Sequence, residues 1–329
     1  EVGDWLVGCD NTRRCVAKYV LGDHDGDTNP YDEDAGLTIS REAGPSGAIS
    51  VDATSGRRIN PATIHVGAAG SDRSLRWKAY DAGRGAQIDG AAAVAFVRGM
   101  RNAETVSWSG SQLKVVVSLR GLAAVLVAMD EAQGRIGNVS ALGRPGPRAA
   151  STTPAAVAPP IVRRGPRLQP MPTSSKLVAT LRRTQAAALK LHGCDQEAGT
   201  DDSADRLDGH SAIVLLECGR FAYQTSVLAF IVPLDRPEAA KPLILPRPMS
   251  SAAPDPDAIG EYVGGSYDAD TRVFSTYAKG RGMADCGESA EWTWDGIAFR
   301  LTAYSLQLRC GGRAGDWPTL FRTRAASSS

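Results

Sequence analysis

Six cysteines constrain this 329-residue chain more than any other feature, because they occur as three pairs whose members are close in sequence. The first pair brackets a short polar turn, CDNTRRC, and 24 residues separate the two members of each other pair. Six cysteines allow 15 pairings, and neighbours in sequence are the easiest to join. We therefore predict three local disulfides, namely Cys9–Cys15, Cys194–Cys218 and Cys286–Cys310.

The cysteine pattern also indicates a compartment. An even number of cysteines in local pairs is typical of oxidising environments. Structural zinc is the alternative, but the chain lacks CxxC and HxxxH spacings and has only four histidines. The sequence starts at Glu1, as a chain does after removal of an export signal, although an arbitrary start would look the same. No apolar run reaches the roughly 18 residues that span a bilayer. We predict a periplasmic or secreted protein.

The residue pattern predicts mostly strands, because apolar and polar residues alternate along many short segments. Trp292 and Trp294 show this alternation, and Asp295-Gly296 after them favours a two-residue hairpin turn. The stretch SLRGLAAVLVAMDEAQGR has helical spacing, with Ser118 as the predicted N-cap. We predict a mainly β (α+β) protein with two antiparallel β-rich domains, a few packed helices and disulfide bonds.

Composition divides the chain in two. Residues 143–175 are rich in Pro, Ala, Arg and Ser, a composition that favours extended geometry and cannot build a core. We predict an N-terminal domain at 1–142 that ends in a helix, a linker at 143–175, and a C-terminal domain at 176–329 that opens with a helix. Each half is long enough to bury a core of its own.

Four stretches carry a family resemblance: WLVGCDNTRRCVA, SLRGLAAVLVAMDEAQGRIGNVSAL, LLECGRFAYQ and STYAKGRGMADCGESAEWTWDGIAFRL. They resemble the bacterial domain-of-unknown-function family eleven seventy-six. The N-terminal half is also similar, more loosely, to the invasion-associated locus B proteins. Both resemblances imply an exported or periplasmic protein of a Gram-negative bacterium, and neither supplies catalytic residues.

The acidic stretch GDHDGDTNPYDEDAG, at residues 22–36, is the candidate metal site. Calcium takes six to eight oxygen ligands, which aspartates alternating on a tight turn can supply. The stretch resembles the calcium loops of thrombospondin-type repeats, although Thr28 and Tyr31 depart from that pattern. The alternative is a solvated acidic hairpin tip. The candidate calcium ligands are Asp23, Asp25, Asp27, Asn29, Asp32 and Asp34.

A basic strip follows in the middle of the chain. No acidic residue occurs between residues 132 and 194, a region rich in arginine. We predict that Arg163, Arg164 and Arg167 bind an anionic partner, such as a polysaccharide, a lipid headgroup or an acidic protein. The alternative is that the strip folds back onto acidic loops of the chain itself. Nucleic acid is not expected as a partner, because no aromatic residues interleave with these arginines.

These patterns favour a non-catalytic binding or interaction module of the bacterial envelope. No catalytic residues are assigned, because the chain has no GxSxG, Walker A or dinucleotide-binding motif. The second hypothesis is an inhibitor or immunity protein that acts on an envelope enzyme. The third is a hydrolase that uses the carboxylates of Asp285 and Glu288. The expected partner is an unknown envelope protein or an anionic ligand.

We predict that calcium raises the melting temperature through the acidic stretch. An ion that binds only the folded loop adds RT ln(1 + [Ca]/Kd) to stability, about 2.7 kcal/mol at a hundredfold excess over Kd. Replacing Asp25 and Asp27 together with alanine should remove the effect. Thermal melts in millimolar calcium and in chelator test this, and an unchanged midpoint would leave the stretch as solvated acid.

Overall fold

The computed structural model describes residues 1–21, 35–68, 74–110, 113–169, 171, 174–194, 201–245 and 260–326. The six candidate calcium ligands, at positions 23 to 34, lie outside these ranges. The chain divides into two compact units, which are described separately. Unit 1 comprises Glu1–Pro159, Met283–Cys286 and Gln307–Phe321, and unit 2 comprises Pro160–Gly282, Gly287–Leu306 and Arg322–Ser329.

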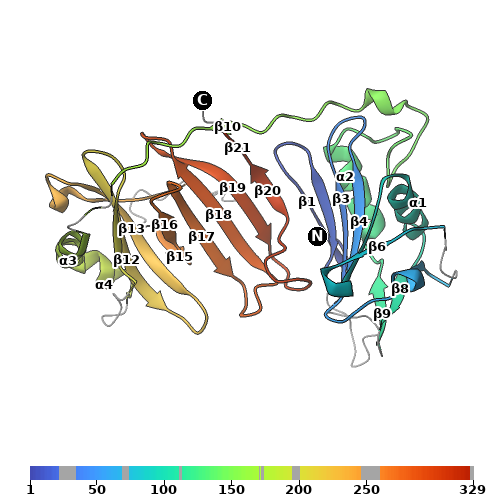
Figure 1. The fold of residues 1–329 in the computed structure, drawn as a ribbon, viewed down its shortest axis with the longest axis horizontal. Helices are drawn as coiled ribbons and strands as arrows, with labels where there is room; N and C mark the ends of the chain where they lie inside the picture. The colour runs from blue at the N-terminus through green and yellow to red at the C-terminus, as the bar shows by residue number, and fades with distance from the viewer. Residues whose placement is uncertain are drawn as a thin grey trace. The chain divides into compact units, whose positions relative to one another are not determined.

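Unit 1 combines antiparallel strands with two helices. In chain order its elements are β1 (Trp5–Cys9), β2 (Cys15–Tyr19), β3 (Gly36–Arg41), β4 (Ile49–Thr54), η1 (Pro61–Thr63), β5 (His65–Val66), β6 (Lys78–Tyr80), η2 (Asp81–Gly83), β7 (Gly85–Asp89), α1 (Gly90–Met100), β8 (Thr105–Gly110), β9 (Leu113–Ser118), α2 (Leu122–Ala132) and η3 (Ala150–Thr152). Six strands form a sheet in the order β1-β2-β3-β4-β7-β6, and β5, β8 and β9 form a smaller one. Both α-helices pack on the larger sheet (Figure 1).

The core of unit 1 lies between the large sheet and its helices. Successive side chains of a strand point to opposite faces, so Leu37 and Ile39 are fully buried while Thr38 between them is half-buried on the outer face. Trp5 is also fully buried and donates its indole N–H to the carbonyl oxygen of Ser118 at 3.0 Å. This bond satisfies the one polar atom of the ring inside the core.

The start of α2 differs from the sequence prediction. Ser118 is the last residue of β9 and does not cap the helix, whose N-cap is Gly121 with a φ of 96°. A Cβ atom at Gly121 would lie 1.9 Å from the carbonyl oxygen of Val2. The chain therefore needs glycine both for the left-handed backbone and for the close approach of the N-terminal segment.

Unit 2 is built from further antiparallel sheets and a helical segment. The elements of the chain from residue 160 onward are β10 (Ile161–Val162), α3 (Ser174–Thr184), α4 (Ala186–Leu191), β11 (Ser203–Arg206), β12 (Ser211–Arg220), β13 (Thr225–Pro233), η4 (Pro237–Ala239), β14 (Lys241–Pro242), β15 (Glu261–Val263), β16 (Ser266–Asp268), β17 (Val273–Lys279), β18 (Gly287–Trp294), β19 (Phe299–Gln307), β20 (Thr319–Arg322) and β21 (Arg324–Ala325). One sheet has the order β11-β12-β13-β14, with β15 also paired to β13, and β16, β17, β18 and β19 follow one another in a second sheet. Most of β20, residues 319–321, belongs to unit 1. β10 pairs with β21 in parallel.

The β18–β19 hairpin has the predicted strands, but its turn is longer than predicted, and Thr293 between the two tryptophans is buried too, at 5% exposure. Trp292 and Trp294 are both buried, at 1% and 6% exposure. The connection has four residues, 295 to 298, and not two. The Asp295 carboxylate accepts the backbone N–H groups of Ile297 and Ala298, each at 2.8 Å, which stabilises the longer turn.

The predicted linker, residues 143–175, is held by hydrogen bonds at several points. In unit 1 the N–H of Gly143 donates to the Asp130 carboxylate at 2.7 Å. In unit 2 the N–H of Gly165 donates to the carbonyl of Trp294 at 2.8 Å. That the two halves fold as separate domains stays a prediction.

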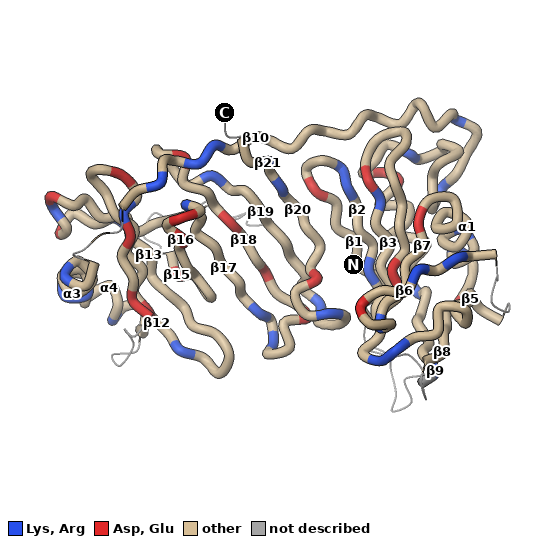
Figure 2. The backbone as a smooth tube through the Cα atoms, in the orientation of Figure 1, with Lys and Arg blue, Asp and Glu red and all other residues tan. Residues whose placement is uncertain are grey.

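The predicted mainly β fold and the predicted disulfides are confirmed. No cysteine is free, and the bonds are Cys9–Cys15, Cys194–Cys218 and Cys286–Cys310. Among the described residues no helix is both long and apolar enough to cross a membrane. Figure 2 shows acidic and basic residues interspersed along the backbone of both units, so neither unit carries charge of one sign only.

We predict that Gly121→Ala destabilises the protein by about 1–3 kcal/mol, because alanine is strained at a positive φ and its Cβ meets the Val2 carbonyl. Gly99→Ala is the matched control. Gly99 lies within α1, and nothing occupies the space its Cβ would fill. That change should stabilise by about 0.5–1 kcal/mol. Urea unfolding midpoints measure both changes, and equal shifts would contradict the prediction.

Candidate functional site

The candidate site is a cavity of about 320 Å³ in unit 2, which we call the arginine pocket. Its charged lining residues are Arg167, Arg206, Arg272, Asp205 and Asp270, and three uncharged neighbours complete it. The arginines outnumber the aspartates in this lining, so the wall carries an excess of positive charge.

Three segments that are far apart in sequence form the arginine pocket. Arg167 lies on the extended chain after β10, and Arg206 ends β11. Arg272 lies in the turn between β16 and β17, with a φ of 63°. In this turn the Asp268 carboxylate accepts the backbone N–H of Asp270 at 2.8 Å. The turn conformation thus places Arg272 against the end of β11.

Arg272 is the most deeply buried charge of the pocket, at 1% exposure. Its Nη1 donates to the carbonyl of Arg206 at 2.8 Å, and its Nη2 donates to the carbonyl of Leu207. Its Nε–H has no acceptor within the described part of the chain, and no carboxylate there forms an ion pair with it. Within the described part of the chain, the direct hydrogen-bond partners of this buried guanidinium group are therefore two backbone carbonyls.

Arg206 is half-buried beside Arg272, and its Nε–H likewise lacks an acceptor among the described residues. At the rim, Arg167 and Asp270 form an exposed ion pair at 2.6 Å. Burial raises the pKa of Asp205, and the nearby Asp268 charge raises it further. The inner wall therefore holds two arginines and one carboxyl group, that of Asp205, whose ionised form is disfavoured by its surroundings.

A tyrosine adjoins the pocket. Burial raises the pKa of Tyr267 to about 12, and the charges of Arg272 and Asp205 also act on it. Its hydroxyl is buried and has no hydrogen-bond partner within the described ranges. The side chain packs edge-on against Phe299, with ring centroids 6.0 Å apart. Tyr267 thus adds a buried polar atom near Arg272 that has no hydrogen-bond partner among the described residues.

Of the arginines predicted to bind an anion, Arg167 alone lines this pocket. Arg163 and Arg164 lie exposed on the same segment. The alternative reading, that the strip meets acidic residues of the chain itself, applies to Arg167 through its pair with Asp270. An anionic partner for these residues stays a prediction.

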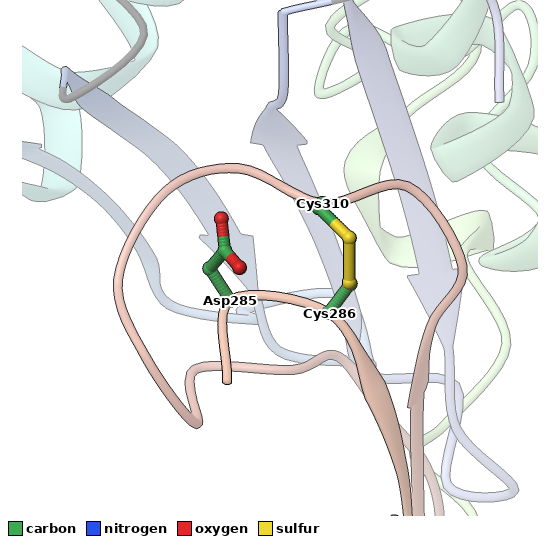
Figure 3. Close-up of side chains that lie close together, drawn as sticks. All are labelled: Asp285, Cys286 and Cys310. Carbon is green, nitrogen blue, oxygen red and sulfur yellow. A yellow bond between two sulfur atoms is a disulfide. The ribbon is translucent and has the colours of Figure 1, made fainter. Parts of the chain in front are cut away.

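Asp285, Cys286 and Cys310 lie close together in unit 1 (Figure 3). The two sulfur atoms form a disulfide, so neither is a thiolate that could bind a metal ion. Asp285 is buried at 2% exposure, whereas Glu288 is half-buried on β18. Neither carboxylate lines the arginine pocket. The hydrolase hypothesis and the absence of catalytic residues both stay predictions.

Sequence reasoning missed the inner wall of the pocket. Asp205, Arg206 and Arg272 belong to no motif, and 66 residues separate the two arginines. The sequence contains one weak signal, because SADR and DADTR each place an arginine after aspartate beside a strand end. The two clusters lie on different sheets, and only the folded structure shows that they meet, through the hydrogen bonds from Arg272 to the carbonyls of Arg206 and Leu207.

The fold and the pocket define a disulfide-bonded, mainly β protein with a positively charged cavity. The chain belongs to the family described as "Protein of unknown function (DUF1176)", whose match covers residues 1–324. A curated relative, "Uncharacterized protein YpfG" of Escherichia coli (strain K12), is 28% identical over 337 residues, covering 98% of this chain and 92% of that protein. No solved structure matches the chain. The predicted family is confirmed, and the likeness to invasion-associated locus B proteins stays a prediction.

We predict that Asp205→Asn stabilises the protein at pH 7. Because the folded-state pKa is raised above the unfolded value, stability falls as pH rises through the interval between them. Asparagine removes that penalty, so the gain should be present at pH 7 and vanish below about pH 3.8. Asp235→Asn, an exposed control in unit 2, should change little. Urea midpoints at both pH values measure this, and a variant less stable than wild type at pH 7 would contradict it.

Proposed function

We propose that this protein is an exported, non-catalytic binding module of the bacterial envelope, and that its arginine pocket binds a small ligand through a phosphate, sulfate or carboxylate group. The observation that carries the proposal is the buried charge of Arg272, which no carboxylate of the described chain compensates. A charge removed from water costs several kcal/mol unless it is paired.

An oxyanion is the ligand whose chemistry meets this need. Guanidinium groups present planar N–H donors that match the oxygen spacing of phosphate and carboxylate. Arg206 adds a second such group on the inner wall, and the cavity of about 320 Å³ is of small-ligand size. The exposed rim pair of Arg167 and Asp270 contributes only about 0–1 kcal/mol. Arg167 can therefore exchange Asp270 for an anion at little cost.

Binding without catalysis is supported by the composition of the wall. Its residues include no serine, cysteine, histidine or lysine, the side chains that most often act as nucleophile or general base. The carboxylates near Asp205 are engaged elsewhere. Asp268 accepts the backbone N–H groups of Asp270 and Thr271, and Asp270 pairs with Arg167 at the rim. This arrangement favours binding over the pair of facing carboxylates that a hydrolase requires.

The periplasm is the compartment that we propose. Three disulfides fit an oxidising environment outside the cytoplasm. Calcium remains part of the proposal as an additional ligand of the acidic stretch at residues 22–36.

Isothermal titration of the purified protein with inorganic phosphate, sulfate and acetate tests the pocket, with sodium chloride at equal ionic strength as the reference. We expect a Kd of about 1 mM for at least one of these anions, equivalent to about −4.1 kcal/mol. Arg206→Gln should weaken binding about tenfold, because a charged hydrogen bond is lost. Asp205→Asn should tighten it, because a like charge is removed.

Arg183→Gln is the matched control, since it removes an exposed arginine of α3 that does not line the pocket. It should leave the Kd unchanged. Equal weakening by Arg183→Gln and Arg206→Gln would show that general positive charge attracts the anions, which contradicts a built site. Absence of binding heat for all three anions would overturn the proposal.

A further inference from the structure

A second cavity lies in unit 1, within residues that the arginine pocket does not use. It has a volume of about 450 Å³. Its floor is the outer face of β3 and β4, its side is Tyr80 at the end of β6, and its cover is the loop at residues 313–316. We call it the sheet cleft.

The floor of the sheet cleft belongs to a polar row that crosses the large sheet. Paired residues on adjacent strands place the side chains next to one another in the order Lys18, Thr38, Asp52, Gln87 and Lys78. A polar row on an outer sheet face is ordinarily solvated. Here the loop at residues 313–316 covers part of the row, so that the polar side chains line a cavity instead of an open surface.

The covering loop is firmly held. The Cys286–Cys310 disulfide joins the chain at its base (Figure 3). The side-chain amide of Gln307 donates to the carbonyls of Asp285 at 2.6 Å and Gly311 at 2.9 Å. The N–H of Gly315 donates to the carbonyl of Ala284 at 2.7 Å. The cleft is therefore pre-formed, so a ligand need not order its walls.

Most charges around the sheet cleft are already compensated. Asp316 pairs with Lys18 at 3.5 Å, and Arg313 pairs with Asp81 at 3.3 Å. Asp52 is the exception: its carboxylate accepts the side-chain amide of Gln87 at 3.0 Å, but no ion pair with a cation is found for it within the described chain. Burial raises the pKa of this half-buried carboxyl, while hydrogen bonds from neighbours oppose the shift.

The lining selects for ligands that donate hydrogen bonds without carrying negative charge. Asp52 accepts such bonds, and repels anions. Hydroxyl groups of Thr38, Ser40 and Thr54 both donate and accept. We propose that the sheet cleft binds a small, uncharged polyhydroxylated ligand, a monosaccharide or a sugar unit of similar size. The cavity of about 450 Å³ is large enough for one such ring.

Tyr80 supplies a ring at the side of this site. It is 37% exposed, and the backbone of Gly85 lies directly against it, so that a Cβ at Gly85 would lie 2.4 Å from the ring. A half-exposed aromatic ring beside hydroxyl and carboxylate groups offers the apolar face that C–H groups of a sugar can cover. Gly85 thus fixes where that ring stands.

Titration of the full chain with glucose, N-acetylglucosamine and glucuronate tests the proposal, with ligand-observed NMR as the readout. We expect at least one neutral sugar to bind with a Kd of about 1 mM, and glucuronate at least tenfold more weakly. Asp52→Asn should weaken neutral-sugar binding about tenfold. Asp89→Asn, an exposed aspartate on the same sheet that does not line the cleft, should leave it unchanged.

Phosphate titration of Asp52→Asn separates this site from the arginine pocket, because phosphate binding should not change. A second variant, Gly85→Ala, should weaken sugar binding by displacing the Tyr80 ring and its side-chain hydrogen bond to Asp52, while the charge of Asp52 is kept. The proposal would be overturned if neither glucose nor N-acetylglucosamine showed saturable binding at concentrations up to about 50 mM. An Asp52→Asn variant that folds and binds as wild type, or preferential binding of glucuronate, would also overturn it.

Discussion

One buried ammonium group, that of Lys18, joins the two ends of the chain within unit 1. The residue is 2% exposed, and burial lowers its pKa, while the Asp316 charge opposes that shift. Its Nζ donates to the carbonyl of Asp316 at 2.5 Å and to the side-chain oxygen of Gln307 at 3.1 Å, across a separation of 289 residues in the latter case. An ammonium without these partners would cost several kcal/mol to bury. The C-terminal loop therefore cannot leave the sheet without exposing or orphaning this charge.

The disulfides join residues that are much closer in sequence than those joined by Lys18. Each joins cysteines at most 24 residues apart, so each stiffens a local loop and none links the two ends of the chain. A cross-link of this span stabilises mainly by restricting the unfolded chain, by about 3 kcal/mol. The position of the C-terminal loop on unit 1 thus depends on non-covalent bonds, with Cys286–Cys310 limiting the shapes the loop can take.

Local features were predictable from the sequence because they depend on residues that are close together in the chain. The Cys9–Cys15 hairpin follows from two alternating strands around a polar turn, and the burial of Trp292 follows from the same period of two. Features that depend on distant residues were not predictable. Asp52, Tyr80 and Arg313 meet only after the sheet has formed, and each taken alone is typical of a solvated surface. The helix α2 was placed correctly, but Ser118 was a wrong N-cap, because the close approach of Val2 demands glycine at Gly121.

The two cavities are both lined by polar residues, but they differ in the sign of the charge that has no ion-pair partner among the described residues. We therefore propose an anionic ligand for one and a neutral ligand for the other. In the arginine pocket the uncompensated charge is the Arg272 guanidinium, and in the sheet cleft it is the Asp52 carboxylate. Salt at physiological strength screens charges over about 8 Å, so each cavity is governed by its own wall and not by the formal net charge of +1. An anion that enters the arginine pocket is attracted by the guanidinium groups of Arg206 and Arg272, and this attraction is reduced by the Asp205 carboxylate of the same wall. The same anion in the sheet cleft would face Asp52 in a partly desolvated space, where repulsion is stronger than in water. The two proposals therefore assign anionic and neutral ligands to separate cavities of one chain, and neither site depends on the other.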